Sequence, residues 1–241
     1  MAWIRRDFVA TLKFSDEGVR VARMAGSRNL EGINLWRSAQ ATHDLGAAAA
    51  ETLAEQALAI LTEVQNPTMM GCALTTLAQL HLVRGELSSA REMIDGAVAL
   101  QRPEFHGVAQ LFMNVNRGWV AVEQGDLVSA RESLLSALTM ARDALGGRAR
   151  LVTPLEGLAQ LAGAAGEPIP ALRLAGAASA LRHQFATPPT PTEVRQLQRW
   201  LVHARAQLDA READTARRAG EQLDPAQAVA EALALLVQLQ S

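Results

Sequence analysis

Small apolar residues recur along this chain at fixed distances from four glycines, Gly46, Gly85, Gly125 and Gly166. When each glycine is numbered as position 15 of a unit, positions 8, 20 and 27 of the later units hold alanine or glycine. These residues are Ala78, Gly118 and Ala159 at position 8, Ala90, Ala130 and Ala171 at position 20, and Ala97, Ala137 and Ala178 at position 27. Small side chains at this spacing let paired helices approach closely, while larger residues such as Leu134 fill the core between them. The pattern therefore predicts a series of packed helix pairs.

The turn between the two helices of a pair carries a sequence motif that occurs twice in the chain. Segment 85–92 comes back, nearly unchanged, 40 residues later as segment 125–132. Self-similarity at this period is typical of stacked helix–turn–helix repeats, none of which buries its apolar face alone. The glycines suit the left-handed position after a helix, where a Cβ would be strained. The acidic residue that follows, Glu86 or Asp126, favours the start of the next helix.

Around these glycines the predicted elements fall into four regions. Residues 1–28 form a partial N-terminal unit or cap, with one helix over residues 16–24. Residues 29–186 form the repeat array of about four helix pairs. Its first helices span residues 29–44, 68–84, 105–124 and 149–165, and its second helices span residues 47–65, 86–101, 127–145 and 170–186. Residues 187–191 hold three prolines and form a stiff connector. Residues 192–241 form C-terminal capping helices.

Two capping boxes mark helix starts in the C-terminal region, one at Thr190 to Glu193 and one at Asp224 to Gln227. The helix after Asp224 is amphipathic, with one stripe that contains Val229, Leu233 and Leu236. We therefore expect this last helix to pack over the final repeat and to shield its apolar face.

Composition favours an all-α fold. Apolar residues make up 49% of the 241 residues and are mostly alanine and leucine, with no tyrosine and five phenylalanines. Alanine and leucine are strong helix formers, whereas the residues that favour strands are scarce. The formal charge of −2 and the isoelectric point near 6.2 argue against direct binding of nucleic acid or of an anionic membrane. Because no signal-peptide core and no apolar run of ~18 residues occurs, we expect a cytoplasmic protein.

No catalytic or metal-binding pattern is found. The histidines are His43, His81, His106, His183 and His203. They form no HExxH motif and no pair at i, i+3 or i+4, so a local metal site is unsupported. The single cysteine, Cys72, excludes an intramolecular disulfide and a CxxC site. Since Lys13 is the only lysine, no P-loop occurs, and no GxSxG motif is present either. We expect no enzyme activity, no metal and no cofactor, and an enzyme with dispersed residues is the weakest alternative.

The small residues at positions 8, 20 and 27, with glycine at position 15, resemble the tetratricopeptide repeat in a longer form. Segments 171–182 and 220–229 are similar to the region that follows the last repeat in large ATP-dependent LuxR-type (MalT-like) transcriptional regulators and related signal-transduction ATPases. The resemblance covers roughly residues 15–240 and implies a right-handed superhelical solenoid of TPR-like units. Those regulators carry an ATPase domain before the repeats and a DNA-binding domain after them, and neither is visible here. We therefore expect either the sensor portion of a larger regulator or a stand-alone relative.

In tetratricopeptide-like stacks the first helices line an inner groove, and the resemblance implies which positions face it. The candidate groove residues for partner binding are Trp36, Gln40, Gln79, Asn116, Trp119, Glu156 and Gln160. An aromatic ring with amides nearby suits an extended peptide or a sugar-like ligand, because the ring supplies apolar area and the amides pair with polar groups. The apolar positions Phe112, Val115 and Val122 are interpreted instead as core between repeats.

Two functions follow as hypotheses. The favoured one is a non-catalytic interaction or sensor module of a transcriptional or signalling regulator, which binds a protein or peptide partner, or a small effector, in its concave groove. The alternative is a structural scaffold that self-associates into a homo-oligomer without binding an effector. The second hypothesis rests on the short N-terminal unit, because a missing helix before Asp16 would leave an apolar end exposed.

Overall fold

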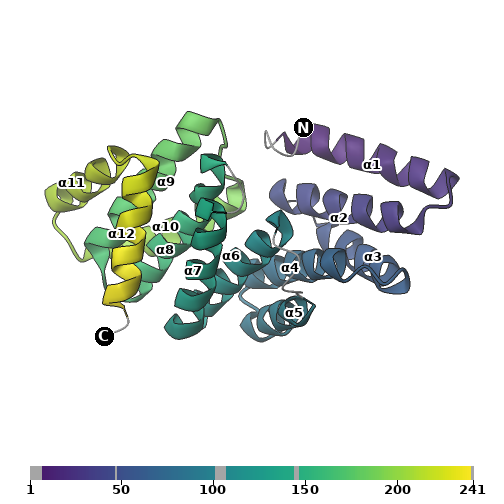
Figure 1. Cartoon of the computed structure of the whole chain (residues 1–241), viewed down its shortest axis with the longest axis horizontal. Helices are drawn as coiled ribbons and strands as arrows, with labels where there is room; N and C mark the ends of the chain where they lie inside the picture. The colour runs from purple at the N-terminus through teal and green to yellow at the C-terminus, as the bar shows by residue number, and fades with distance from the viewer. Residues whose placement is uncertain (1–6, 47, 101–106, 144–146, 240–241) are drawn as a thin grey trace. The chain divides into compact units, whose positions relative to one another are not determined.

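The computed structural model describes residues 7–46, 48–100, 107–143 and 147–239, and these residues form helices joined by short connections, with no strand among them (Figure 1). The helices are α1 (Phe8–Met24), α2 (Arg28–Asp44), α3 (Ala50–Glu63), α4 (Pro67–Arg84), α5 (Leu87–Ala99), α6 (Val108–Glu123), α7 (Leu127–Asp143), the short 3-10 helix η1 (Arg148–Leu151), α8 (Val152–Ala164), α9 (Pro168–Phe185), α10 (Pro191–Ala206), α11 (Ala210–Glu221) and α12 (Pro225–Gln238). The all-α prediction is therefore confirmed.

The chain divides into two compact units. Unit 1 comprises Met1–Phe105 with Thr190–Thr192, and unit 2 comprises His106–Pro189 with Glu193–Ser241. In unit 1, helices α1 to α5 each pack on the next, and α2 also contacts α4. In unit 2, α6 to α9 pack in the same sequential way, α6 also contacts α8, α11 packs on α9, and α12 contacts α7, α8 and α9. Sequential packing is the arrangement that helical repeats adopt. The right-handed superhelix and the repeat length stay predictions.

The four recurring glycines lie at the C-terminal end of the first helix of each pair. Gly85 and Gly125 have φ of 78° and 74°, in the left-handed region, as Gly46 and Gly166 do. At Gly85 the amide of Glu86 donates to the carbonyl of His81 at 3.0 Å, which is the long bond of a Schellman motif. The predicted helices are found in place, with described ends that differ from the prediction by at most three residues. The predicted ends at residues 47, 101, 105 and 145 lie outside the described residues.

The small repeated residues allow close helix packing, as expected. The six alanines at positions 20 and 27 all have 0% of their surface exposed: Ala90, Ala97, Ala130, Ala137, Ala171 and Ala178. Leu134 on α7 lies against two glycines of neighbouring helices. A Cβ on Gly118 would lie 2.6 Å from Leu134 Cγ, and one on Gly157 would lie 2.5 Å from Leu134 Cδ2. The leucine side chain therefore fills space that any larger residue on α6 or α8 would occupy.

The N-terminal helix is longer than predicted. It begins at Phe8, where Asp7 accepts a hydrogen bond from the amide of Ala10 at 2.9 Å, whereas the sequence indicated a helix only from residue 16. In the first two turns of α1, Thr11 and Ser15 are buried, each with 4% of its surface exposed. These small polar residues at buried positions conceal the amphipathic pattern.

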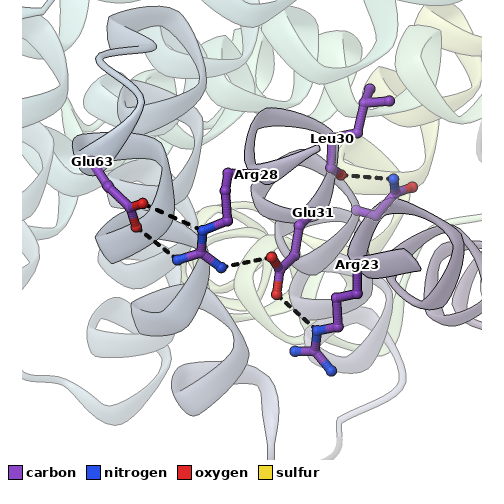
Figure 2. A network of polar contacts seen from close by, with 6 residues as sticks. Arg23, Arg28, Leu30, Glu31 and Glu63 are labelled. Carbon is purple, nitrogen blue, oxygen red and sulfur yellow. Dashed lines mark hydrogen bonds and ion pairs between the residues drawn. The ribbon is translucent and has the colours of Figure 1, made fainter. Parts of the chain in front are cut away.

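A buried carboxylate joins the first three helices (Figure 2). Glu31 on α2 has a side chain 7% exposed; it accepts from Arg23 Nε of α1 at 2.8 Å and from Arg28 Nη1 at 2.6 Å. Arg28 in turn pairs with Glu63 of α3 at 2.7 Å. The hydrogen bond from Arg23 is the largest cause that lowers the pKa of Glu31, and that from Arg28 adds to it against the opposing effect of burial. The carboxylate therefore remains ionised where it is buried.

The C-terminal region contains three helices, which the prediction of capping helices did not separate. Asp224 forms the expected capping box and accepts from the amide of Gln227 at 2.9 Å. A second capping box, which the sequence reasoning missed, starts α11: Asp209 accepts from the amide of Glu212 at 2.8 Å. The sequence signal for it is the D-x-x-E spacing of these two residues.

Helix α12 packs over the last helix pair, as predicted. Its apolar stripe is mostly buried, with Val229 6% and Leu236 2% exposed. No helix in the described part of the chain is long and apolar enough to cross a membrane.

Candidate partner-binding faces

The candidate residues lie on the first helices of the pairs and form two separate faces. Trp36 and Gln40 on α2, with Gln79 on α4, belong to unit 1, and we call this surface the α2/α4 face. The remaining candidates belong to unit 2 and define the α6/α8 face: Asn116 and Trp119 on α6, with Glu156 and Gln160 on α8. Each face is described on its own.

A chain of hydrogen bonds joins the three candidates of the α2/α4 face. Trp36 Nε1 donates to Thr76 Oγ1 at 3.1 Å, and Thr76 Oγ1 lies 3.3 Å from Gln40 Oε1. Gln40 Nε2 then donates to Gln79 Oε1 at 3.4 Å. Gln40 is 6% exposed, whereas Trp36 and Gln79 are half-buried and retain accessible surface. Thr76, which the sequence reasoning did not single out, connects the indole to the amides.

The four candidates of the α6/α8 face are buried. Asn116, Trp119, Gln160 and Glu156 expose only 2%, 4%, 3% and 4% of their surface. Asn116 Nδ2 donates to the carbonyl of Phe112 at 2.8 Å, but Asn116 Oδ1 and Trp119 Nε1 have no hydrogen-bond partner among the described residues. The indole nitrogen lies 3.0 Å from the point that a Cβ on Gly157 would occupy. That these residues contact a partner stays a prediction.

Glu156 has a defined role inside unit 2. It accepts two hydrogen bonds from Arg182 of α9, from Nε and from Nη2, both at 2.6 Å. Arg182 also donates from Nη1 to the carbonyl of Thr187 at 2.9 Å, and its Nη2 lies 3.3 Å from Glu193 of α10. Burial lowers the pKa of Arg182, but the hydrogen bonds and charges of Glu156 and Glu193 outweigh this effect and raise it. The guanidinium therefore stays charged and ties α8, α9 and the start of α10 together.

Helix α10 lies on the α6/α8 face, which the sequence reasoning missed. Trp200 Nε1 donates to Glu123 Oε1 at 3.1 Å, and Arg199 forms an ion pair with the same carboxylate. On α8, a Cβ on Gly163 would lie 3.8 Å from Trp200 Cβ. Glu123 follows Trp119 by four residues on α6, and Gly163 follows Gln160 by three on α8, so each contact falls on the stripe that carries the candidates.

Helix α10 makes a shallow contact with this face. Over residues 193–206 only Ala204 is buried, whereas α9 buries nine residues from Ala171 to Arg182. Val202 is 63% exposed, and Arg195, Gln198 and His203 are also exposed. The sequence signal for this helix is its capping start and its alternation of arginine with Val194, Leu197 and Leu201.

The described residues contain no group of three or more His, Cys, Asp or Glu side chains that could hold a metal ion. Cys72 is 1% exposed, and burial raises the pKa of its thiol to about 12. The thiol therefore stays protonated at neutral pH and has the character of a core residue.

Comparison of the chain with protein-family models, with curated proteins and with solved structures gave no match, so its function is argued from the geometry of the two faces.

Proposed function

We propose that this chain is a non-catalytic helical-repeat interaction module that binds an extended peptide of a protein partner at its α2/α4 face. The observation that carries the proposal is the hydrogen-bonded row of Trp36, Thr76, Gln40 and Gln79, whose end residues Trp36 and Gln79 are only half-buried. Such a module would serve as the sensor part of a transcriptional or signalling regulator, in keeping with the resemblance to LuxR-type proteins.

The hydrogen-bonded row suits a peptide because its inner residues orient the outer amide of Gln79. Gln40 and Thr76 are held in place by neighbours inside unit 1, so the Gln79 Oε1 acceptor is oriented before any ligand arrives. The Nε2 group of Gln79 has no partner among the described residues and is left to donate to a peptide carbonyl. The part of Trp36 that is not packed against the core of unit 1 offers apolar area on the adjacent helix α2 at low cost in conformational entropy.

Selection of peptides from a displayed random library against the full chain tests this proposal. We expect selected peptides to lose at least tenfold in affinity for Gln79→Ala and for Trp36→Ala, measured by fluorescence anisotropy. Gln198→Ala, an exposed amide on α10, is the matched control and leaves affinity unchanged. Equal affinity of all variants, with native far-UV circular dichroism, would show that the α2/α4 face is not the binding site.

Self-association remains the second candidate, because α1 carries an exposed apolar stripe. Phe14, Val21 and Met24 are 66%, 50% and 76% exposed and follow the i, i+7, i+10 spacing of a coiled-coil seam. A second copy of α1 would cover this stripe. Light scattering over a range of concentrations decides the matter: a dimer that Phe14→Glu abolishes supports the scaffold, and a monomer at every concentration removes it.

A further inference from the structure

We propose that α1 and α2 together form a docking patch for an amphipathic helix of a partner protein, one that carries a carboxylate beside its apolar residues. The α1/α2 patch consists of Phe14, Gly18 and Val21 on α1 with Leu30, Asn34 and Arg37 on α2. It lies on a different side of α2 from Trp36, which bonds to α4. The inference therefore does not rest on peptide binding at the α2/α4 face.

Two pairs of side chains fix the register of α1 against α2. Arg23 Nε donates to Glu31 at 2.8 Å, and Ser38 Oγ donates to Asp16 Oδ1 at 2.8 Å. Residues seven apart on α1 thus meet residues seven apart on α2 in reverse order, so the two helices are antiparallel. Because residues at i and i+7 share one side of a helix, both pairs lie along the same flank of the contact.

The other flank of this contact carries the centre of the patch. A Cβ on Gly18 would lie 2.5 Å from Asn34 Oδ1, so the asparagine side chain lies directly against the glycine of α1. Asn34 Nδ2 donates to the carbonyl of Leu30 at 2.8 Å, and Leu30 points away from the Glu31 network (Figure 2). The centre of the patch is therefore uncharged, and on α1 it has no side chain that projects from the surface.

The two ends of the patch follow from helical periodicity. Phe14 and Val21 lie four residues before and three residues after the central glycine of α1. Leu30 and Arg37 lie four residues before and three residues after the central asparagine of α2. Since residues three or four apart are neighbours on a helix surface and the helices are antiparallel, Val21 comes beside Leu30 at one end. Phe14 comes beside Arg37 at the other end.

The spacing of the apolar residues suits a helix. Phe14, Val21 and Leu30 are 66%, 50% and 52% exposed, and covering them removes apolar surface from water. The two ends of the patch are seven residues apart along α1, which is about 10 Å or two helical turns. An amphipathic helix presents apolar residues at this same spacing, and a small residue midway between them would face the centre of the patch.

Arg37 decides the charge of the occupant. It is exposed and makes no ion pair or hydrogen bond among the described residues, whereas the other arginines of α1 and α2 are each paired with a carboxylate. The patch itself contains no acidic residue, so a second copy of it would bring another arginine instead of a counter-charge. A partner helix with aspartate or glutamate beside its apolar residues covers the patch and pairs with the guanidinium.

Selection of helical miniproteins on the full chain tests this inference. The library displays a three-helix scaffold with one helix face randomised, and clones that also bind the double variant Leu30→Ser/Arg37→Glu are removed. We expect the remaining clones to carry apolar residues two turns apart with a carboxylate beside them. Arg37→Glu and Leu30→Ser should each weaken their binding at least tenfold in biolayer interferometry. Replacing the carboxylate of a clone by lysine should restore its binding to Arg37→Glu.

Exposed residues of the same kinds in unit 2 provide matched controls. Arg218→Glu on α11 and Val128→Ser on α7 should leave the affinity unchanged. Gln79→Ala should also leave it unchanged, which separates this patch from the α2/α4 face. The proposal is overturned when no clone remains after the subtraction, or when Arg37→Glu, with native far-UV circular dichroism, binds the clones as the wild type does. A dimer in light scattering that Phe14→Glu abolishes would identify a second copy as the occupant and overturn the assignment to a partner protein.

Discussion

The crossing of α9 and α11 offers the sharpest test of how this sequence builds unit 2. A Cβ added to Gly220 would lie 2.7 Å from the carbonyl carbon of Arg173 and 2.8 Å from its Cα, and still closer to its oxygen. Ordinary van der Waals contacts of a Cβ begin at 3.4 Å, so α11 must move away from α9 by more than the roughly 0.7 Å that the carbonyl carbon alone requires. The obstructing atoms are backbone, and no change of rotamer can relieve the overlap.

Two effects of opposite sign compete in Gly220→Ala. Alanine is favoured over glycine inside a helix by about 1 kcal/mol. Overpacking costs about 1 to 3 kcal/mol, and backbone against backbone places this site at the upper end. We therefore expect a net loss of about 2 kcal/mol in the free energy of unfolding of unit 2.

Gly163→Ala is the matched control, because it makes the same exchange in a helix of the same unit. Its Cβ would meet nothing closer than the Trp200 carbonyl oxygen at 3.7 Å. Only the helix preference then acts, and the variant should gain about 0.5 to 1 kcal/mol. Urea unfolding followed by far-UV circular dichroism, with hydrogen exchange to localise the change to α9 and α11, measures both. If Gly220→Ala proved as stable as Gly163→Ala, the close crossing would be refuted.

Three further outcomes follow from the packing and the charges. The pKa of Glu31 is lowered in the folded chain, so the ionised carboxylate stabilises the fold above its ordinary pKa of 4.5, and this stabilisation is lost as pH falls through the lower folded pKa. Glu31→Gln should therefore cost about 1 to 2 kcal/mol of unfolding free energy at pH 7. In urea titrations at several pH values, the variant should also show a weaker loss of stability in acid. Leu134→Ala removes the side chain packed on two glycines and should destabilise unit 2 by about 2 to 5 kcal/mol, with retained stability contradicting the packing. The buried thiol of Cys72, with its pKa near 12, should react with a disulfide reagent only after denaturant is added; reaction in the native protein at pH 8 would argue against its burial.

The sequence predicts the repeating part of the fold well because its signals there are local. Two examples are Gly85, with φ of 78°, and Ala130, which is fully buried. Each feature can be predicted from the residue type and its position in the repeat. The N-terminal helix was predicted too short for the opposite reason. Thr11 and Ser15 are polar residues at buried positions of α1, which packs on α2, and their residue types give no sign of this burial.

The sequence assigns the candidate residues to helices that the structure contains, but it does not predict the burial or the hydrogen bonds of their side chains. Trp36, Gln40 and Gln79 fall on one face, and Thr76 joins them through contacts between residues about 40 positions apart. Nothing in the spacing of Trp119 or Gln160 indicates that α10 lies on the same face, because that depends on contacts made by Trp200 across 77 residues. Long-range pairings of this kind leave no periodic trace in the chain.

The position of Leu134 has a mechanical consequence. Its side chain fits against Gly118 of α6 and Gly157 of α8 at once, so the two helices cannot slide past each other without forcing it into backbone. Sliding of α6 along α8 therefore carries a steric cost at this single leucine, which holds the two helices of the α6/α8 face in one register.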